Sequence, residues 1–202
     1  WLGRTKKVGI LSRQDALDYL CTGPVARASG VDWDNRRDFP YAAYADYDFK
    51  VPVRQEGDSN ARYMVRMDEL AESVKICRQA LTKIEESTPS RPLPYRTDDR
   101  KVVAPPKWEI TRSMESLIHH FKLFTEGYAP PPGEVFQRVE SPRGELAFHM
   151  VSDGSNRPYR MHVRTPSFPH VQVMPVLLKG YLLADVVVIL ASLDFVLGDV
   201  DR

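Results

Sequence analysis

Apolar residues recur every three or four positions in two stretches of the chain, 59–84 and 113–126. This spacing is typical of helices that bury one face, so it predicts two amphipathic helices. Asp58 or Ser59 can cap the start of the first helix, and Gly127 can end the second. The longer stretch is long enough to run the length of a helical bundle.

Three short runs separated by turns predict strands. Residues 135–139 and 146–151 lie on either side of the Ser141–Gly144 turn, and 159–163 alternates after a second polar turn. These three strands form a small antiparallel sheet, and 49–53 predicts a further short strand. The expected fold class is therefore α+β: a helical bundle with a small antiparallel sheet.

The most apolar run, 181–200, lies near the end of the chain. Pro175 begins the last helix at a position that proline favours. The run contains aspartates, including Asp185 and Asp194, whereas a bilayer span is nearly free of charge. We therefore expect a buried helix, whose carboxylates need partners and are either tied down structurally or placed to handle protons.

Polar and proline-rich segments separate these elements. Ser12 can cap an early helix, which Gly23-Pro24 breaks. Residues 86–107 contain several prolines that exclude regular structure from most of the segment, and we interpret it as a connection. The chain begins at Trp1 rather than methionine, so we expect residues to precede it.

The composition excludes several classes of function. The net charge of the 202 residues is only +1, so no basic field attracts nucleic acid, and we expect no nucleic-acid partner. Cys21 and Cys77 lack metal-ligand spacing and are expected to remain thiols. Adjacent His119 and His120 point about 100° apart on a helix, so we expect core or interface histidines and no bound metal.

Three arginines, Arg27, Arg36 and Arg37, lie in a turn-rich loop. They can grip a carboxylate or a neighbouring subunit. The alternative is a solvated loop with local ion pairs. The sequence contains no nucleophile elbow, Walker loop, dinucleotide fingerprint or HExxH motif.

Several spaced motifs, covering nearly the whole chain, resemble the C-terminal half of one family. This family is the D subunit of NADH–quinone oxidoreductase, respiratory complex I, called the 49-kilodalton subunit in mitochondria. The resemblance implies that 1–202 is the C-terminal part of that protein, without the N-terminal half that carries a tyrosine and a histidine for the quinone. The motifs are Gly23-Pro24, 27–30, 113–122, 125–127, 142–145, 151–160 and 198–202.

That family is similar in fold to the large subunit of nickel–iron hydrogenases, with which it shares the turn at 142–144. Hydrogenases bind their metals through a C-terminal CxxC, where this chain has Val196 and Asp199. Without thiolates a nickel–iron centre cannot be held, and the resemblance implies that the cavity became a quinone chamber. The chain departs from the family at Ala26, Phe195 and Asp199.

The resemblance implies a subunit of a proton-pumping NADH:quinone oxidoreductase that helps to form the quinone-reduction chamber beside the terminal iron–sulfur cluster. Quinone is its substrate, and it binds no metal or flavin. NADH and the iron–sulfur clusters belong to partner subunits, notably the one with the terminal cluster, and the membrane arm is a further partner. The implied location is peripheral: the cytoplasmic face of the inner (plasma) membrane in a bacterium, or the matrix side in a mitochondrion. The chain alone is not expected to be active.

Site residues follow from the same resemblance. Asp194 and Asp201 are the implied catalytic residues, and Asp194, Val196 and Gly198 are the implied quinone-binding residues. The implied subunit interface contains Arg27, Arg36, Arg37, His119 and His120. Two alternatives stay open: a structural scaffold subunit without quinone contact, and a hydrogenase-like enzyme, which the missing cysteines disfavour.

Overall fold

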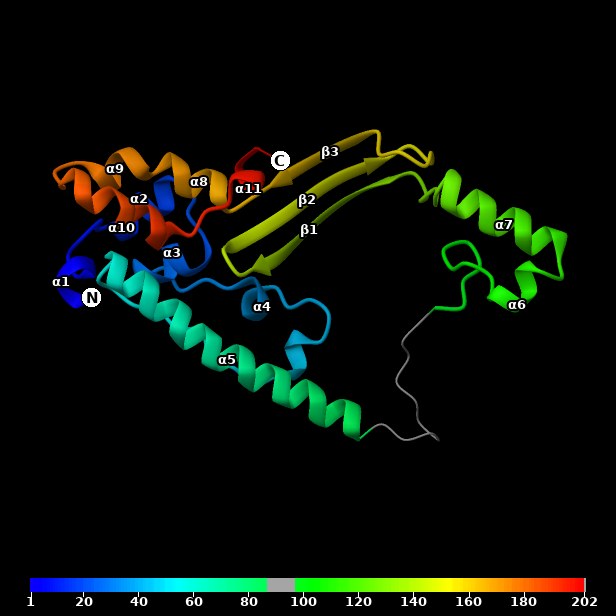
Figure 1. Ribbon diagram of the computed structural model, residues 1–202, viewed down its shortest axis with the longest axis horizontal. Coiled ribbons are helices and arrows are strands. Elements are labelled where there is room, and N and C mark those ends of the chain that lie inside the picture. Colours follow the sequence, from blue (N-terminus) through cyan, green and yellow to red (C-terminus); the bar gives the residue numbers. More distant parts are fainter. Residues whose placement is uncertain (87–96, 202) are drawn as a thin grey trace. The chain divides into compact units, whose positions relative to one another are not determined.

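The computed structural model describes residues 1–86 and 97–201 and confirms the α+β class (Figure 1). The three strands form one antiparallel sheet in the order β1-β2-β3. The elements are α1 (Leu2–Thr5), α2 (Arg13–Asp18), α3 (Gly23–Ala28), α4 (Asn35–Asp38), η1 (Tyr44–Asp46), α5 (Ser59–Glu85), α6 (Lys107–Ile110), α7 (Met114–Thr125), β1 (Gly133–Ser141), β2 (Gly144–Ser152), β3 (Arg160–Arg164), α8 (Ser167–Gln172), α9 (Met174–Leu178), α10 (Leu183–Leu193) and α11 (Leu197–Asp201).

Both long amphipathic helices form at the predicted positions. Asp58 caps α5, because its Oδ1 accepts a hydrogen bond from the Ala61 N–H at 2.7 Å. Ser113 caps α7 in the same way through the Ser116 N–H. The three strands of the predicted sheet are also confirmed, and the hairpin strands extend beyond their predicted bounds.

The chain divides into two compact units, and the first holds the main core. It contains residues 1–82, 137–148 and 163–202. Helices α2, α3, α9 and α10 meet in a cluster that includes Leu11, Val25, Leu177, Ile189 and Leu193, each almost inaccessible to solvent. A smaller cluster of Ala28, Ala61 and Val65 packs α3 against α5.

The second unit contains residues 83–136 and 149–162. Glu109 of α6 accepts a hydrogen bond from the Ser116 hydroxyl of α7 at 2.6 Å, which joins the two helices. The Asn156 amide donates to the Glu126 carbonyl and anchors the turn before β3. The apolar side chains of α7 lie largely exposed in this chain, including Phe121 and Phe124.

The predicted strand at 49–53 and the predicted role of Gly23-Pro24 were both wrong. Residues 49–53 form no strand. The Lys50 N–H donates to the Glu72 side chain of α5 at 2.8 Å, and the Asp48 N–H donates to Gln79 of the same helix. These backbone groups therefore bond to helix side chains, and Pro52 has no N–H to offer a neighbouring strand. Gly23-Pro24 does not end the early helix, because α2 already ends at Asp18; the pair begins α3.

The apolar run 181–200 also differs from the expected buried helix. Pro175 lies in the short α9, and the run forms α10 and α11 as separate helices. One face of α10 is buried through Ile189 and Leu193, but Leu183 is 87% exposed and Val187 is 70% exposed. Within the described residues, no helix is long and apolar enough to cross a bilayer.

The Pro-rich connection predicted at 86–107 lies partly outside the described residues, which omit 87–96. Residues 97–106 contain no helix or strand, as predicted, and α6 begins at Lys107. Both cysteines are free thiols in the structure, Cys21 buried and Cys77 exposed. Burial raises the pKa of Cys21 to about 12.

His170 of α8 gives the fold a built-in sensitivity to acid. Its imidazole is fully buried, with Nε2 3.1 Å from the Thr22 carbonyl, and no described residue forms a hydrogen bond with Nδ1. Its pKa is lowered from 6.5 to about 4, mainly by burial; the hydrogen bond with the Thr22 carbonyl and Asp199 act to raise it, and Arg66 and Arg164 act to lower it. The folded protein therefore keeps the ring neutral at pH values where the unfolded chain binds a proton.

We expect the neutral His170 ring to cost the folded protein nothing above pH 6.5. As the pH falls from 6.5 toward 4, the unfolded chain binds a proton at this ring and the folded protein does not, so the free energy of unfolding decreases. The slope is about 1.4 kcal/mol per pH unit, so about 2 kcal/mol disappears between pH 6.5 and 5. His170→Gln keeps a donor for the Thr22 carbonyl and does not titrate. Melting of the assembled wild-type and variant proteins at several pH values tests this: parallel pH dependences would contradict it.

Candidate functional site at the end of helix α10

Asp194 follows α10 in the left-handed conformation, with φ of 53° and ψ of 44°. Its side chain is 46% exposed, so the expectation that it is buried was wrong. One carboxylate oxygen lies 3.6 Å from Arg143 Nη2 and the other lies 4.0 Å from Arg66 Nε. The partners predicted for this carboxylate are therefore two guanidinium groups.

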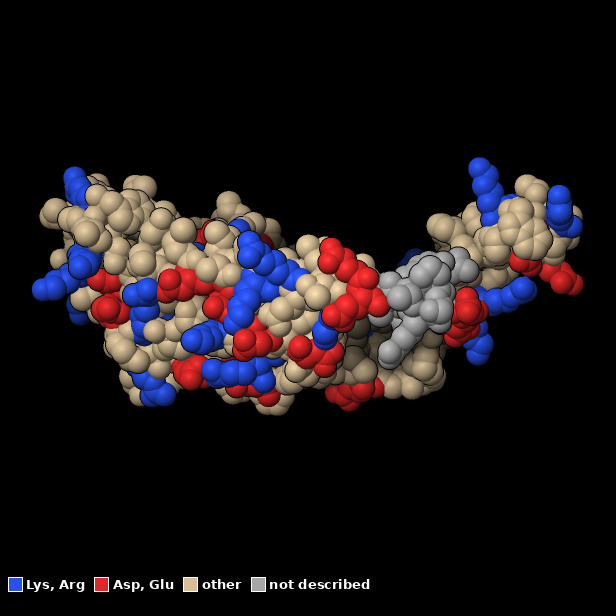
Figure 2. Space-filling model, turned by 90° about the horizontal axis from the view of Figure 1, so that it is seen from below, with Lys and Arg blue, Asp and Glu red and all other residues tan. Residues whose placement is uncertain are grey.

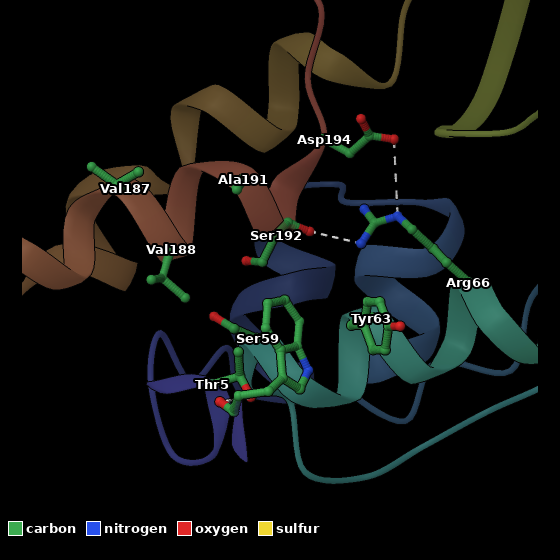
Figure 3. A pocket seen from close by; sticks show the side chains of 10 residues that line it. Thr5, Ser59, Tyr63, Arg66, Val187, Val188, Ala191, Ser192 and Asp194 are labelled. Atoms are coloured by element: carbon green, nitrogen blue, oxygen red, sulfur yellow. Dashed lines mark hydrogen bonds and ion pairs between the residues drawn. The ribbon is translucent and has the colours of Figure 1, made fainter. Parts of the chain in front are cut away.

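The same two arginines bind the last carbonyl groups of α10. Arg66 donates to the Ser192 carbonyl at 2.8 Å and to the Leu193 carbonyl at 3.3 Å. Arg143 Nε donates to the Asp194 carbonyl at 2.8 Å. Helix C-termini carry partial negative charge and unpaired carbonyls, so guanidinium groups are well suited to this position. They hold Asp194 at a defined place, as Figure 3 shows for Arg66.

The position of Arg143 depends on an unusually close contact of two backbones. Gly144 has φ of +139°, and a Cβ there would lie 2.6 Å from Thr22 Oγ1. A Cβ on Gly23 would lie 2.4 Å from the Gly144 Cα. The Thr22 hydroxyl also accepts from the Glu145 N–H at 3.1 Å. The hairpin turn thus packs directly on the start of α3, where a side chain has no room.

Two pockets share Arg66 and Asp194 in their linings. One, of about 300 Å³, is mostly apolar and lies between α10 and the start of α5 (Figure 3). The other, of about 440 Å³, is more polar. The first is lined by Trp1, Thr5, Ser59, Tyr63, Arg66, Val187, Val188, Ala191, Ser192 and Asp194. The second is lined by Arg27, Arg36, Tyr44, Arg66, Glu69, Leu70, Ser73, Glu140, Ser141, Pro142 and Asp194.

A buried ion-pair network borders the polar pocket. Arg27 is 1% exposed, and its guanidinium contacts Glu69 at 2.7 Å, Glu140 at 2.9 Å and Asp34 at 3.4 Å. Asp34 is also paired with Arg36 at 2.6 Å. These contacts join α3, α4, α5 and the end of β1. Arg27 therefore has an internal role, whereas its place at a subunit interface stays a prediction.

The other predicted interface residues are dispersed. Arg37 is half-exposed and pairs with Asp32 and Asp38. These local pairs, like that of Arg36, match the alternative of a loop with its own ion pairs, and the interface role of both stays a prediction. His119 and His120 lie on α7 in the second unit, where the His120 ring packs 4.7 Å from that of Phe124.

The predicted quinone-binding residues lie just after α10. Val196 is 42% exposed, and its N–H points to Ser167 Oγ at 3.5 Å. Gly198 and Asp201 are exposed on α11. Asp199 accepts a hydrogen bond from the Ser167 N–H at 3.1 Å, which ties α11 to α8. Their roles stay predictions.

Sequence reasoning did not single out Arg62, Arg66 or Glu69. Their only signal was three charged residues on the helical face that also presents Ala61 and Val65. Among the described residues, no group of three or more histidine, cysteine, aspartate or glutamate side chains is arranged to hold a metal ion. Basic and acidic side chains lie intermixed on the face shown in Figure 2.

The fold and the site define an α+β protein whose charged centre combines a helix end, a long helix and a hairpin turn. A profile of the family described as respiratory-chain NADH dehydrogenase, 49 Kd subunit, matches residues 1–202, and the chain belongs to this family. It is 52% identical over 202 residues to a D subunit of NADH-quinone oxidoreductase from Roseiflexus sp. strain RS-1, covering 100% of the chain and 48% of that protein.

Other relatives show the same coverage. The chain is 50% identical over 202 residues to the NADH-quinone oxidoreductase D subunit of Geotalea uraniireducens, covering all of the chain and 50% of that protein. It is 50% identical over 199 residues to the D subunit of the same enzyme from Rhodospirillum centenum, covering 98% of the chain and 49% of that protein. The chain thus spans about half the length of the curated relatives it matches.

Proposed function

We propose that this chain is the C-terminal part of the D subunit of NADH:quinone oxidoreductase and forms part of the wall of its quinone-reduction chamber. Its membership of the 49 Kd subunit family supports the assignment to this complex. In this proposal, quinone is the substrate, while NADH and the iron–sulfur clusters are bound by partner subunits. The complex is bound to the membrane, and this chain is a peripheral part of it.

The position of Asp194 is the observation on which the chamber proposal rests. Its carboxylate is half-exposed, held by two arginines and placed in the lining of an apolar pocket. Ligand pockets are typically apolar with a few well-placed polar groups, and this pocket of about 300 Å³ is at the small end of their range. Val196, two residues further on, adds an exposed apolar side chain.

This arrangement suits proton transfer to a reduced quinone. A quinone takes up protons as well as electrons when it is reduced to a quinol. The electrons come from a partner's iron–sulfur cluster, and Asp194 supplies a proton to a quinone oxygen as a positioned general acid. Arg66 and Arg143 then stabilise the resulting carboxylate and keep it in place, because both guanidinium groups already contact it.

A scaffold role without quinone contact is the second candidate. Arg143 contacts both the Asp194 carbonyl and the Asp194 carboxylate, and this observation favours the scaffold role. A purely structural helix end needs such contacts. The two candidates differ in whether the charge of the Asp194 carboxylate is needed. The proton-transfer role needs it, whereas a structural cap depends more on the backbone carbonyl.

We expect Asp194→Asn in the assembled complex to lower quinone reduction about a hundredfold, the lower end of what a positioned acid contributes. Electron transfer from NADH to an artificial acceptor should not change, because it bypasses the quinone chamber. Val196→Met adds volume without polarity and should weaken or strengthen quinone-site inhibitors with little loss of assembly.

Asp68→Asn is the matched control. Asp68 lies on α5, is 44% exposed and pairs with Arg54 at 2.6 Å, so its environment resembles that of Asp194. It lines neither pocket, and its substitution should leave quinone reduction unchanged. Wild-type quinone kinetics and inhibitor binding in both Asp194→Asn and Val196→Met, with normal assembly, would favour the scaffold role.

A further inference from the structure

The buried network around Arg27 contains more acidic than basic groups. In its ion pairs, two guanidiniums, those of Arg27 and Arg36, face three carboxylates, those of Asp34, Glu69 and Glu140. Arg66 also acts on Glu69, but its own ion pair is with Asp194. Apart from Glu69, whose side chain is 14% exposed, the carboxylates are almost completely buried. An unbalanced buried charge is costly, and proteins usually remove it by neutralising one group. One of the three carboxylates is therefore expected to carry a proton.

The hydrogen bonds indicate which carboxylate this is. Asp34 is held by Arg36 through both carboxylate oxygens and by the Arg36 N–H. Glu140 accepts from Arg27 through one oxygen and from the backbone and side chain of Asn35 through the other. Three or more N–H donors favour the charged form of a carboxylate.

Glu69 is different. Its Oε1 accepts from Arg27 Nε at 2.8 Å, and the described residues provide no hydrogen bond to its Oε2. Glu69 also lines the polar pocket, so a proton on Oε2 would face that pocket. Burial raises the pKa of Glu69, although Arg27 acts in the opposite direction. Burial also raises the pKa of Glu140, against the effect of Arg27 and the Asn35 N–H.

The polar pocket connects Glu69 to the proposed acid. Asp194 lines the same pocket, and Arg66, one helical turn before Glu69 on α5, pairs with Asp194. A volume of about 440 Å³ holds several water molecules, each of which occupies about 30 Å³ in the liquid. Arginine, glutamate and serine side chains in the lining supply the polar partners that such waters need.

We propose that Glu69 holds a proton in the resting protein and passes it across the polar pocket to Asp194. This inference rests on the proposed role of Asp194 and extends it to the supply of its proton. The proton leaves Glu69 Oε2 for a pocket water, and that water passes one of its own protons to the Asp194 carboxylate. The negative charge moves to Glu69, where Arg27 is already in contact with Oε1. Glu69 regains a proton from solvent through the pocket opening.

Glu69 acts through Asp194 and is therefore a positioning residue in proton supply. Its behaviour depends on the charged groups that surround it, which come from several elements. They are Arg27 on α3, Asp34 just before α4, Arg36 on α4, Arg66 on α5, Glu140 on β1 and Asp194 after α10.

The experiment compares Glu69→Gln, Glu69→Asp and the control Glu72→Gln in the assembled complex. Glu72 lies on the same helix and accepts from the Lys50 N–H, outside both pockets. We expect Glu69→Gln to lower the kcat of quinone reduction at least about tenfold with unchanged assembly, because the amide resembles the neutral acid but has no proton to give. Glu69→Asp should recover part of the rate, and Glu72→Gln should behave as wild type.

Infrared difference spectra of the oxidised and reduced complex give a readout that a structural role would not change. We expect a carbonyl band of a protonated carboxylic acid that disappears in Glu69→Gln and shifts in Glu69→Asp. The wild-type quinone reduction rate should fall at high pH as Glu69 loses its proton, and Glu69→Gln should lack that fall. If Glu69→Gln fails to assemble, the band in Glu69→Asp decides: an unshifted band overturns the proposal.

The outcomes separate this inference from the proposed function. A defective Asp194→Asn with a wild-type Glu69→Gln rate and an unchanged band would overturn the role of Glu69 and leave the role of Asp194. A wild-type Asp194→Asn rate would overturn the role of Asp194 as the acid, and Glu69 would then have no acceptor there. A lower Glu69→Gln rate with an unchanged band and pH profile would show a structural role and overturn the proposal.

Discussion

Arg62→Ala is expected to lower the free energy of unfolding by about 4 kcal/mol or more. Arg62 is completely buried on α5 and donates to the carbonyls of Gly57 and Gly9 at 2.8 Å and to the Ser192 hydroxyl at 2.9 Å. The buried Gly9 carbonyl loses its donor, at a cost of about 1–3 kcal/mol, whereas the Gly57 carbonyl keeps the Leu11 N–H at 2.9 Å. The cavity left by the long side chain adds to this cost.

The position of Arg62 makes this effect larger than that of an ordinary buried arginine. Its bonds tie the Gly9 turn and the start of α5 to the end of α10, so their loss loosens the segment that carries Asp194. Burial lowers the pKa of Arg62 to about 10, which still leaves the group charged at neutral pH. Arg62→Met fills part of the cavity but cannot donate, so its destabilisation should be intermediate.

The amount and melting temperature of the assembled complex in membranes measure this effect. Arg78→Ala is the control, because Arg78 is an exposed arginine on the same helix. Exposed substitutions usually change stability by less than about 0.5 kcal/mol. Equal yields and melting temperatures for Arg62→Ala and Arg78→Ala would show that the Gly9 carbonyl finds another partner.

Gly144→Ala is expected to reduce both stability and quinone reduction. The backbone at φ of +139° is strained for any residue with a Cβ, and that Cβ would lie 2.6 Å from Thr22 Oγ1 and 2.9 Å from the Thr22 carbonyl carbon. Backbone strain of about 1–3 kcal/mol adds to a similar cost of overpacking. The turn must move away from α3, and Arg143 moves with it.

The second effect follows from the hydrogen bond between Arg143 and the Asp194 carbonyl. A shift of the turn releases the helix end, so the rate of quinone reduction should fall further than the amount of assembled complex explains. Gly133→Ala is the control, since nothing lies within 4 Å of a Cβ there and its φ is not in the left-handed region. A Gly144→Ala complex with normal yield and rate would mean that this contact is not required.

The sequence predicted the two long helices and the three strands because their signals are local. The three- and four-residue spacing of α5 and α7, their caps and the turns that bound the strands depend on neighbours within a few residues. The strand predicted at 49–53 failed because alternation is a weak signal over five residues, and side chains of α5 bind the backbone that a strand partner would need.

Burial was harder to predict than helix formation. The composition of 181–200 indicated a fully buried helix, but hydropathy does not say on how many sides a helix is covered. In this chain α10 is covered on one face. The helix stops at Asp194, which is in the left-handed conformation, and Arg66 and Arg143 bind the carbonyls of Ser192 and Asp194 there. Those arginines are 128 and 51 positions away in the sequence.

The sequence by itself determined the fold class, the positions of the long helices and the hairpin, and the motifs that place the chain in its family. Each of these depends on residue types at short, fixed spacings. The tertiary structure decided which charges meet: Arg66 and Arg143 at Asp194, and Glu69 and Glu140 at Arg27. Ion pairs between distant segments leave no periodic trace, because a charged residue on an exposed face and one in a buried network look the same in the sequence.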